Sequence, residues 1–199
     1  MTTPAESTVP HVPVVIVLEG LDGVGKSTAA AGLAAKLGAD LMVTPPPEIT
    51  PFRDFFDKRP ELRPGFYMTG NFIASRHMAE AVAAGRSVVC DRFYASTISY
   101  PLGKRGELPS EGSHEYAWPS ELLRPTHMIQ LVLPEVDRIA RRASRRSVAE
   151  TPEEAELRED AARSARVSEA FTRMGCMSVS AEGTTADVVQ RILDLIGEH

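Results

Sequence analysis

Runs of apolar residues recur along the chain, and stretches with helical spacing lie between them. A short, continuous apolar run is typical of a buried strand, whereas apolar residues at intervals of three and four positions are typical of a helix. The expected strands cover residues 12–18, 41–44, 87–90, 127–133 and 176–181. The expected helices cover residues 26–38, 64–84, 135–146, 152–174 and 185–197.

Alternating strands and helices predict parallel strand pairing, right-handed crossovers and helices on both faces of the sheet. We find no internal repeat and no low-complexity tract. We therefore predict one α/β domain over residues 12–199, with three layers around a five-stranded parallel sheet. Residues 1–11 lack an apolar core and are predicted to be a disordered tail that is neither a signal peptide nor a transit peptide.

The composition narrows the classes of function. Of 199 residues, 43% are hydrophobic and 25% are charged, and the net charge is −5, which argues against a surface that coats nucleic acid. No apolar stretch approaches the roughly 20 residues of a membrane span. Cys90 and Cys176 each lie in a short apolar run and are expected to be buried, reduced thiols. The sequence thus predicts a cytoplasmic protein that binds neither nucleic acid nor membranes.

The first chemical motif is EGLDGVGKST at residues 19–28. It contains Gly-x-x-x-x-Gly-Lys-Ser between an expected strand and an expected helix, which is the context of a P-loop. Backbone N–H groups and a helix N-terminus would hold polyphosphate there, Lys26 would reach the β- and γ-phosphates, and the Ser27 hydroxyl would bind Mg²⁺. The alternative is a Gly-rich turn with an incidental lysine. The predicted ATP-binding residues are Gly20, Gly23, Val24, Gly25, Lys26, Ser27 and Thr28.

The second motif is VVCDRFYAST at residues 88–97, where an apolar strand ends at Asp91 and Arg92. Ligands of open α/β sheets bind at the carboxyl ends of the strands. Asp91 is predicted to hold Mg²⁺ through water or to orient the attacking group, and Arg92 to bridge donor and acceptor phosphates. The alternative is an ion pair on the surface. The chain lacks the Asn-Lys-x-Asp segment with which a GTPase would read guanine.

The third motif is RIARRASRR at residues 138–146. On a helix, Arg138, Arg141 and Arg145 share one face. We predict a mobile lid over about residues 138–152 whose arginines close over ATP during transfer. The alternative is a solvated helix neutralised by the glutamates that follow. The predicted catalytic residues are Lys26, Asp91, Arg92, Arg138, Arg141 and Arg145.

These motifs resemble those of the thymidylate kinase family: its P-loop with an internal Asp, its DR-aromatic-x-x-Ser motif and its arginine-rich lid. Within that family, the chain is most similar to the mitochondrial-type UMP/CMP kinases. The resemblance covers nearly everything from Val14 to Leu195. The segments that carry it are TPPPE (44–48), FRDFFD (52–57), GFYMTGNF (65–72), YAWPSELLRP (116–125) and TPEEAELRE (151–159).

The resemblance implies an acceptor site as well as an ATP site. Asp22 would accept a hydrogen bond from the acceptor's sugar hydroxyl, and the structural alternative is an aspartate favoured by the turn before a helix. Phe66 or Tyr67 would stack on the acceptor base, and the alternative is ordinary core packing of these rings. Asn71, on the same helical face as Tyr67, would offer its amide to the base edge. The family likeness also implies a homodimer. The remaining acceptor residues by this comparison are Arg53 and Arg92 near the phosphate and Tyr100 beside the sugar and base.

The chain departs from the family at two points. Thymidylate kinases carry an Arg-Glu-Pro-Gly type segment where this chain has TPPPE, which favours CMP, UMP, dCMP or dUMP over thymidylate as the acceptor. Some members place an arginine directly after the loop aspartate, where this chain has Gly23, so the lid arginines gain importance.

The sequence therefore predicts phosphorylation of a pyrimidine nucleoside monophosphate, with ATP as donor and Mg²⁺ as cofactor. The alternatives are dTMP or a modified pyrimidine nucleotide as acceptor, a nucleoside kinase, and a regulatory module that binds ATP without kinase activity.

Overall fold

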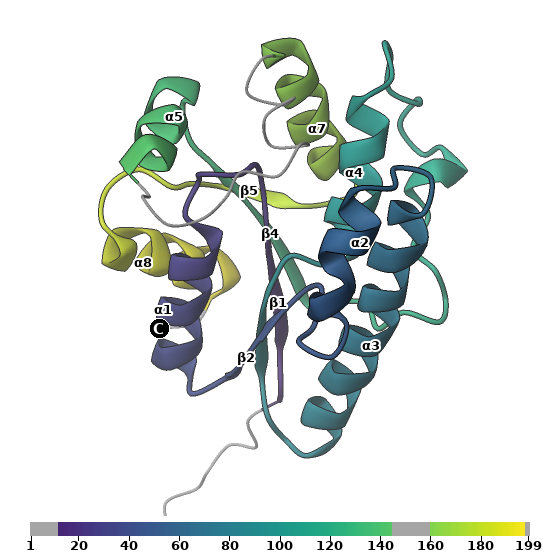
Figure 1. Ribbon diagram of the computed structural model, residues 1–199. Helices are drawn as coiled ribbons and strands as arrows, with labels where there is room; N and C mark the ends of the chain where they lie inside the picture. The colour runs from purple at the N-terminus through teal and green to yellow at the C-terminus, as the bar shows by residue number, and fades with distance from the viewer. Residues whose placement is uncertain (1–11, 145–159, 198–199) are drawn as a thin grey trace, which may run out of the picture.

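The computed structural model describes residues 12–144 and 160–197, so the expected tail and the outer part of the expected lid lie outside the described residues. The strands form one five-stranded sheet in the order β2-β3-β1-β4-β5, and every neighbouring pair is parallel (Figure 1). The predicted α/β fold is thereby confirmed. The strands are β1 (Val15–Glu19), β2 (Asp40–Val43), β3 (Val88–Asp91), β4 (His127–Val132) and β5 (Met177–Ser180).

Helices cover both faces of the sheet, as predicted (Figure 1). Helices α1 (Lys26–Leu37) and α8 (Thr185–Ile196) pack on one face. Helices α3 (Arg63–Ala83), α4 (Tyr94–Gly103) and α7 (Ala161–Arg173) pack on the other. The remaining described elements are α2 (Arg53–Asp57), α5 (Glu135–Ser144) and the short 3₁₀ helices η1 (Thr50–Phe52) and η2 (His114–Tyr116).

The central strand β1 divides the core into two halves. Its side chains alternate between the faces, as in every strand: Val15 and Val17 pack toward α3, α4 and α7, and Ile16 and Leu18 pack toward α1 and α8. All four are buried. A strand that is covered on both faces needs a continuous apolar sequence, which explains the run from which it was predicted.

Helix α4 and the short helix α2 are absent from the sequence-based expectation. The α4 sequence, YASTISYPLG, contains β-branched residues and Pro101, all poor helix formers. The helix forms because it is buried against α7 and the sheet, and because a carboxylate from β1 satisfies backbone N–H groups at its start. Tertiary contacts therefore outweigh propensity here.

Two further expectations can be compared with the structure. Cys90 and Cys176 are both buried and carry free thiols. Within residues 12–144 and 160–197, no helix combines the length and the apolar character needed to cross a bilayer.

Gly103 allows α4 and α7 to approach closely. A Cβ atom at this position would lie 2.3 Å from Cγ2 of Val167 and 3.3 Å from its backbone nitrogen. A methyl group therefore cannot fit unless one helix moves. By contrast, a Cβ atom at Gly65, in the first turn of α3, meets no atom within 4 Å.

We predict that Gly103→Ala lowers the free energy of unfolding by about 1–3 kcal/mol, because overpacking displaces α4 from α7. Gly65→Ala is the matched control and should leave that free energy unchanged or raise it slightly. Urea unfolding of the two variants and the parent protein measures the difference. Equal stabilities of the two variants would contradict the close helix contact.

Candidate active site

The loop between β1 and α1 has the backbone shape that an anion site needs. Gly20 has φ 131°, and a Cβ there would lie 2.5 Å from the carbonyl oxygen of Leu131 on β4. Gly25, with φ 99°, is the N-cap residue of α1, and no described side chain caps this helix. The N–H groups of its first turn and the positive end of its dipole are thus suited to bind phosphate.

Lys26 is buried at the start of α1. Its Nζ donates a hydrogen bond to the Leu21 carbonyl oxygen at 2.8 Å and lies 3.7 Å from Oδ1 of Asp22. Burial, together with the nearby Arg92 cation, lowers the pKa of Lys26 to about 8 despite the opposing carboxylates. A polyphosphate at the loop would stabilise the charged ammonium.

The start of α1 and the end of β3 meet at Ser27 and Asp91. The Ser27 hydroxyl donates a hydrogen bond to Oδ2 of Asp91 at 2.5 Å. Oδ1 of Asp91 is buried and has no hydrogen-bond partner among the described residues. An oxygen of this kind, beside a hydroxyl, fits a hard divalent cation such as Mg²⁺.

The protein would supply only part of the coordination of such an ion. Within the described ranges, no three His, Cys, Asp or Glu side chains are grouped to hold a metal ion. Mg²⁺ commonly keeps several waters and binds through one or two protein oxygens plus substrate phosphate oxygens. Ser27 and Asp91 therefore fit a magnesium that arrives with a nucleotide.

Arg92 is the link between the two motifs. Its backbone is left-handed, with φ 68°, and its N–H donates to the Leu18 carbonyl oxygen on β1. Its guanidinium forms an ion pair with Asp22 of the phosphate loop. It also donates to the hydroxyl groups of Ser96 and Tyr100, both at 3.1 Å. The predicted acceptor arginine is therefore anchored to α4 and to the phosphate loop together.

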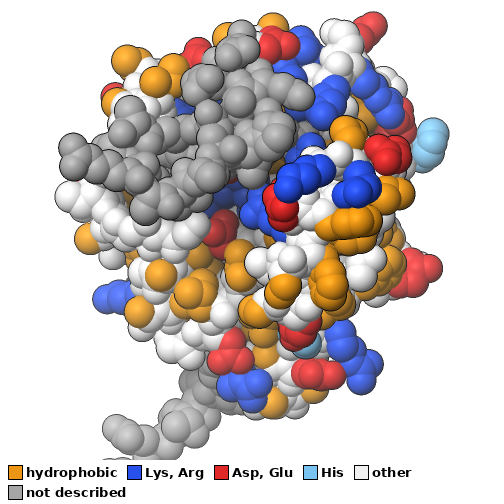
Figure 2. Space-filling view, viewed as in Figure 1, with side chains coloured by type: hydrophobic (Ala, Val, Ile, Leu, Met, Phe, Trp, Pro, Cys, Tyr) orange, Lys and Arg blue, Asp and Glu red, His pale blue; other side chains and the backbone are white. Residues whose placement is uncertain are grey.

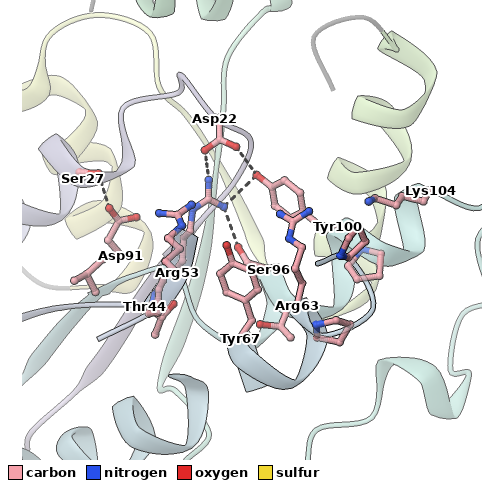
Figure 3. A pocket seen from close by; sticks show the side chains of 17 residues that line it. Asp22, Ser27, Thr44, Arg53, Arg63, Tyr67, Asp91, Ser96, Tyr100 and Lys104 are labelled. Atoms are coloured by element: carbon pink, nitrogen blue, oxygen red, sulfur yellow. Dashed lines mark hydrogen bonds and ion pairs between the residues drawn. The ribbon is translucent and has the colours of Figure 1, made fainter. Parts of the chain in front are cut away.

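The Asp22 carboxylate contacts Lys26 at the start of α1 and also groups outside its own loop. Besides its ion pair with Arg92, it accepts a hydrogen bond from the Tyr100 hydroxyl at 3.1 Å (Figure 3). The carboxylate, the guanidinium and the phenol thus form one cluster at the edge of a cavity. This arrangement differs from that of a turn aspartate that only caps a helix.

Glu19, which precedes the phosphate loop, is fully buried. Its Oε1 accepts hydrogen bonds from the backbone N–H groups of Phe93 and Ser96, at 3.0 and 3.3 Å, and its Oε2 accepts one from the Ser96 hydroxyl at 2.5 Å. The carboxylate of β1 therefore caps α4 from a distant part of the chain. Burial raises the pKa of Glu19 to about 7, although these hydrogen bonds and Arg92 oppose the rise.

One cavity of about 540 Å³ connects these parts (Figure 3). Basic and acidic side chains lie together at the edge of the corresponding hollow in Figure 2. The cavity opens onto the end of the phosphate loop and extends between α2, α3 and α4. Of the residues predicted from the sequence, it brings together Asp22, Ser27, Arg53, Tyr67, Asp91, Arg92 and Tyr100.

Two residues assigned to the acceptor base do not line this cavity. Phe66 is buried and stacks on Phe56, with ring centroids 4.8 Å apart and planes 18° from parallel. Asn71 is buried too, and its amide donates to the hydroxyl of Thr97 at 2.8 Å. Tyr67 thus remains the candidate stacking residue, and the assignment of Phe66 to the base is corrected because its ring packs between α2 and α3.

The sequence did not single out several residues that the cavity contains: Arg63, Ser96, Thr97 and Lys104. Two of them could have been found from helical spacing, since Arg63 precedes Tyr67 by four residues and Lys104 follows Tyr100 by four. Ser96 and Thr97 belong to the second motif but lie on a helix that the sequence analysis did not predict.

The arginines of the predicted lid are only partly described. Arg141 of α5 donates to the Val24 carbonyl oxygen of the phosphate loop at 3.2 Å and to that of Ala181 at 2.9 Å. Arg138 is almost completely buried and lies 3.7 Å from Glu135. Arg145 lies outside the described residues. Arg141 is therefore placed against the phosphate loop, while Arg138 is part of the packing of α5.

Comparisons with known proteins place the chain in a family and agree with its fold. The family model for thymidylate kinase matches residues 18–192. Human mitochondrial UMP-CMP kinase 2 is 34% identical over 190 residues, which is 92% of this chain but only 42% of that protein. A thymidylate kinase of Rhizorhabdus wittichii is 29% identical over 92% of this chain and 96% of its own. The solved thymidylate kinase of Candida albicans shares the fold, with a TM-score of 0.66, 19% identity and coverage of 93% of this chain and 91% of that one.

We predict that Glu19→Gln changes how stability depends on pH. The pKa of Glu19 is about 7 in the folded state and near 4.5 when exposed, so the unfolded state releases its proton first as the pH rises. The folded state then loses up to about 1.4 kcal/mol of stability per pH unit between these two values. Glutamine does not titrate, and its amide can still accept at the start of α4.

The measurement is urea unfolding of both proteins at about pH 5, 6, 7 and 8. Relative to the glutamine variant, the parent protein should be most stable at the lowest pH, lose stability toward neutral pH and change little above it. Parallel pH profiles of the two proteins would contradict the raised pKa.

Proposed function

The chain belongs to the thymidylate kinase family, and from this premise we propose that it catalyses ATP + pyrimidine NMP → ADP + NDP. The observation that carries the proposal is the single cavity, in which Ser27 and Asp91 lie at one end and Arg53 and Tyr67 line the walls between α2 and α3. A site with a phosphate loop and a second, cationic pocket suits transfer between two phosphorylated ligands.

On the donor side, the backbone of the phosphate loop would hold the ATP phosphates. Lys26 would approach the β- and γ-phosphates, since its Nζ lies at the base of the loop. Arg141, whose guanidinium already touches the loop backbone, would supply positive charge next to the transferred group. Arg138 and Arg145 remain candidates for this role by the family resemblance alone.

On the acceptor side, Arg92 and Arg53 would hold the acceptor phosphate, and Asp22 would accept from the sugar hydroxyl. Tyr67 would stack on the base and Tyr100 would lie beside the sugar. Asn71 would act through Thr97, whose hydroxyl it fixes at the cavity wall. These roles need Asp22 and Arg92, which are paired with each other, to exchange partners when the acceptor binds.

The proposed reaction requires positioning and charge stabilisation rather than covalent chemistry by the protein. An acceptor phosphate oxygen attacks the γ-phosphorus of ATP, the bond to the β-phosphate oxygen breaks, and ADP leaves with that electron pair. Mg²⁺, held by Ser27 and Asp91, would neutralise charge on the donor phosphates. The side chains around the cavity would exclude water, so that transfer to water does not compete.

The segment after β2 bears on which base the acceptor carries. The absence of the Arg-Glu-Pro-Gly type segment favours CMP, UMP, dCMP or dUMP, while dTMP or a modified pyrimidine nucleotide is compatible with the family. A nucleoside kinase would leave the cavity arginines without an anion to bind, and an ATP-binding regulatory module would give no NDP. A cytoplasmic location and a homodimer stay predictions.

The test is a panel of CMP, dCMP, UMP, dUMP and dTMP with ATP and Mg²⁺, followed by chromatographic detection of both ADP and the nucleoside diphosphate. We expect equal amounts of the two products with at least one of these monophosphates, and no ADP when Mg²⁺ is chelated. Release of ADP without a new diphosphate would favour an ATPase, and product from the nucleosides alone would favour a nucleoside kinase.

We predict that Asp22→Ala raises the KM for the acceptor by about tenfold or more, because both the sugar contact and the anchor of Arg92 are lost. The KM for ATP should change by less than about twofold, since the phosphate loop backbone and Lys26 remain. Steady-state kinetics with each substrate varied in turn measure both values. An equal rise in the KM values for ATP and for the acceptor would refute the assignment of Asp22 to the acceptor.

A further inference from the structure

One carboxylate behind the cavity wall holds three side chains that line the cavity. Asp57, the last residue of α2, has a side chain that is 13% exposed and is not among the described lining residues. Its Oδ2 accepts a hydrogen bond from Nε of Arg53 at 3.2 Å. Its Oδ1 accepts one from the Tyr67 hydroxyl at 3.2 Å and lies 3.4 Å from Nε of Arg63.

These partners come from two helices, α2 and α3. Arg53 begins the five-residue helix α2, whereas Arg63 and Tyr67 lie one turn apart on α3. Two guanidinium groups in one wall repel each other unless an anion lies between them. Asp57 is that anion, and Phe56, which stacks on Phe66, fixes α2 against α3 at the adjacent position.

The contacts also determine which edge of each guanidinium Asp57 holds. In both ion pairs with Asp57 the nitrogen is Nε, which donates a hydrogen bond to the carboxylate in Arg53 and makes an ionic contact without a hydrogen bond in Arg63. A guanidinium whose inner nitrogen faces the carboxylate can turn its terminal nitrogens toward a phosphate, and in Arg53 and Arg63 the Tyr67 hydroxyl is a further hydrogen-bond partner. Burial raises the pKa of Tyr67, so its hydroxyl stays protonated and donates to the carboxylate.

The charges of the wall are suited to a phosphorylated ligand. Two guanidinium charges and one carboxylate leave a net charge of +1 on the cluster of Arg53, Arg63 and Asp57. The other arginine of the cavity, Arg92, is already ion-paired with Asp22. The cluster on α2 and α3 is thus a part of the cavity wall with excess positive charge before any ligand binds.

We propose that Asp57 is a positioning residue that aligns Arg53 and Arg63 as a two-arginine fork for the acceptor's phosphate and holds the ring of Tyr67 beside it. The proposal rests on the proposed function and extends it. It adds Arg63 to the residues that contact the acceptor. It also attributes the arrangement of the side chains in the acceptor pocket to Asp57, a carboxylate that the substrate does not touch.

The same helix offers a matched control. Asp54 is three residues before Asp57, is 80% exposed and pairs only with the exposed Lys58 among the contacts described for it. Asp57→Asn and Asp54→Asn remove the same charge from the same helix with nearly the same volume. Only the first removes the carboxylate that lies behind the cavity wall.

The experiment measures kcat and the KM values for ATP and for the best acceptor of the panel. Asp57→Asn should raise the acceptor KM by about tenfold or more and leave the ATP KM within about twofold, because the charge-assisted hydrogen bond to Arg53 and the ion pair with Arg63 are lost. Asp54→Asn should match the parent protein in both. A purely structural role would instead lower the amount of active enzyme and leave both KM values unchanged.

Arg63→Lys makes the test independent of how well Asp57→Asn folds, because lysine keeps the charge but cannot form the fork. This variant should also have a raised KM for the acceptor and a nearly unchanged KM for ATP. In the double variant that combines Asp57→Asn with Arg63→Lys, Asp57→Asn should raise the acceptor KM by a smaller factor than it does in the parent protein. The reason is that Asp57 acts through Arg63 and Arg53.

The outcomes separate the two proposals. The role of Asp57 is overturned, and the proposed function is not, if the Asp57 and Asp54 variants of an active enzyme have equal acceptor KM values. The same holds if Asp57→Asn raises the KM values for ATP and for the acceptor equally. The role of Asp57 is also overturned if the two substitutions raise the acceptor KM of the double variant by the product of their separate factors. A parent protein that makes no diphosphate from any monophosphate overturns the proposed function, and the role of Asp57 with it.

Discussion

The candidate site depends on the register between two parallel strands. Leu18 of β1 pairs with Asp91 of β3, so the chain leaves both strands at the same edge of the sheet. One exit becomes the phosphate loop and the other becomes the turn that carries Arg92. Because the strands are hydrogen-bonded neighbours, these two loops begin one strand spacing apart, about 5 Å. A shift of the register would separate Ser27 from Asp91 and Asp22 from Arg92 at once.

Within that frame, the site is built from charged groups that satisfy one another. Asp22 pairs with Arg92, and Asp57 pairs with Arg53 and Arg63. Charges that are partly removed from water are stable only when they have partners of this kind. A ligand with its own phosphate and hydroxyl groups can replace some of these partners without leaving a charge unpaired. The arrangement is therefore compatible with both an empty cavity and an occupied one.

The parts of the fold that could be predicted are those set by local sequence. The buried strands and the phosphate loop carry their own patterns, and the structure has them within a few residues of the predicted positions. Helix α4 could not be predicted because its stability comes from Glu19, whose hydrogen bond to Phe93 spans 74 positions, and from its contact with α7. The helix propensities of the α4 residues contain no information about a cap supplied by a distant residue.

The acceptor side of the site was predictable only in part, for the same reason. The family motif pointed to Tyr67 and its neighbour equally, and only the packing of Phe56 on Phe66 shows which ring belongs to the core. Arg63 belongs to no motif, and only its spacing of four residues from Tyr67 on a helix pointed to it. Its position in the wall follows from Asp57, which belongs to the preceding helix.

The left-handed backbone of Arg92 has a consequence for the entropy of binding. A non-glycine residue in this conformation costs about 1–2 kcal/mol, a strain that is present before any ligand arrives. The backbone and the surrounding hydroxyl groups hold the guanidinium in one orientation, so this long side chain has already lost most of its rotamer freedom. A ligand that binds Arg92 therefore has little of that side chain left to order, and more of its interaction energy is available as affinity.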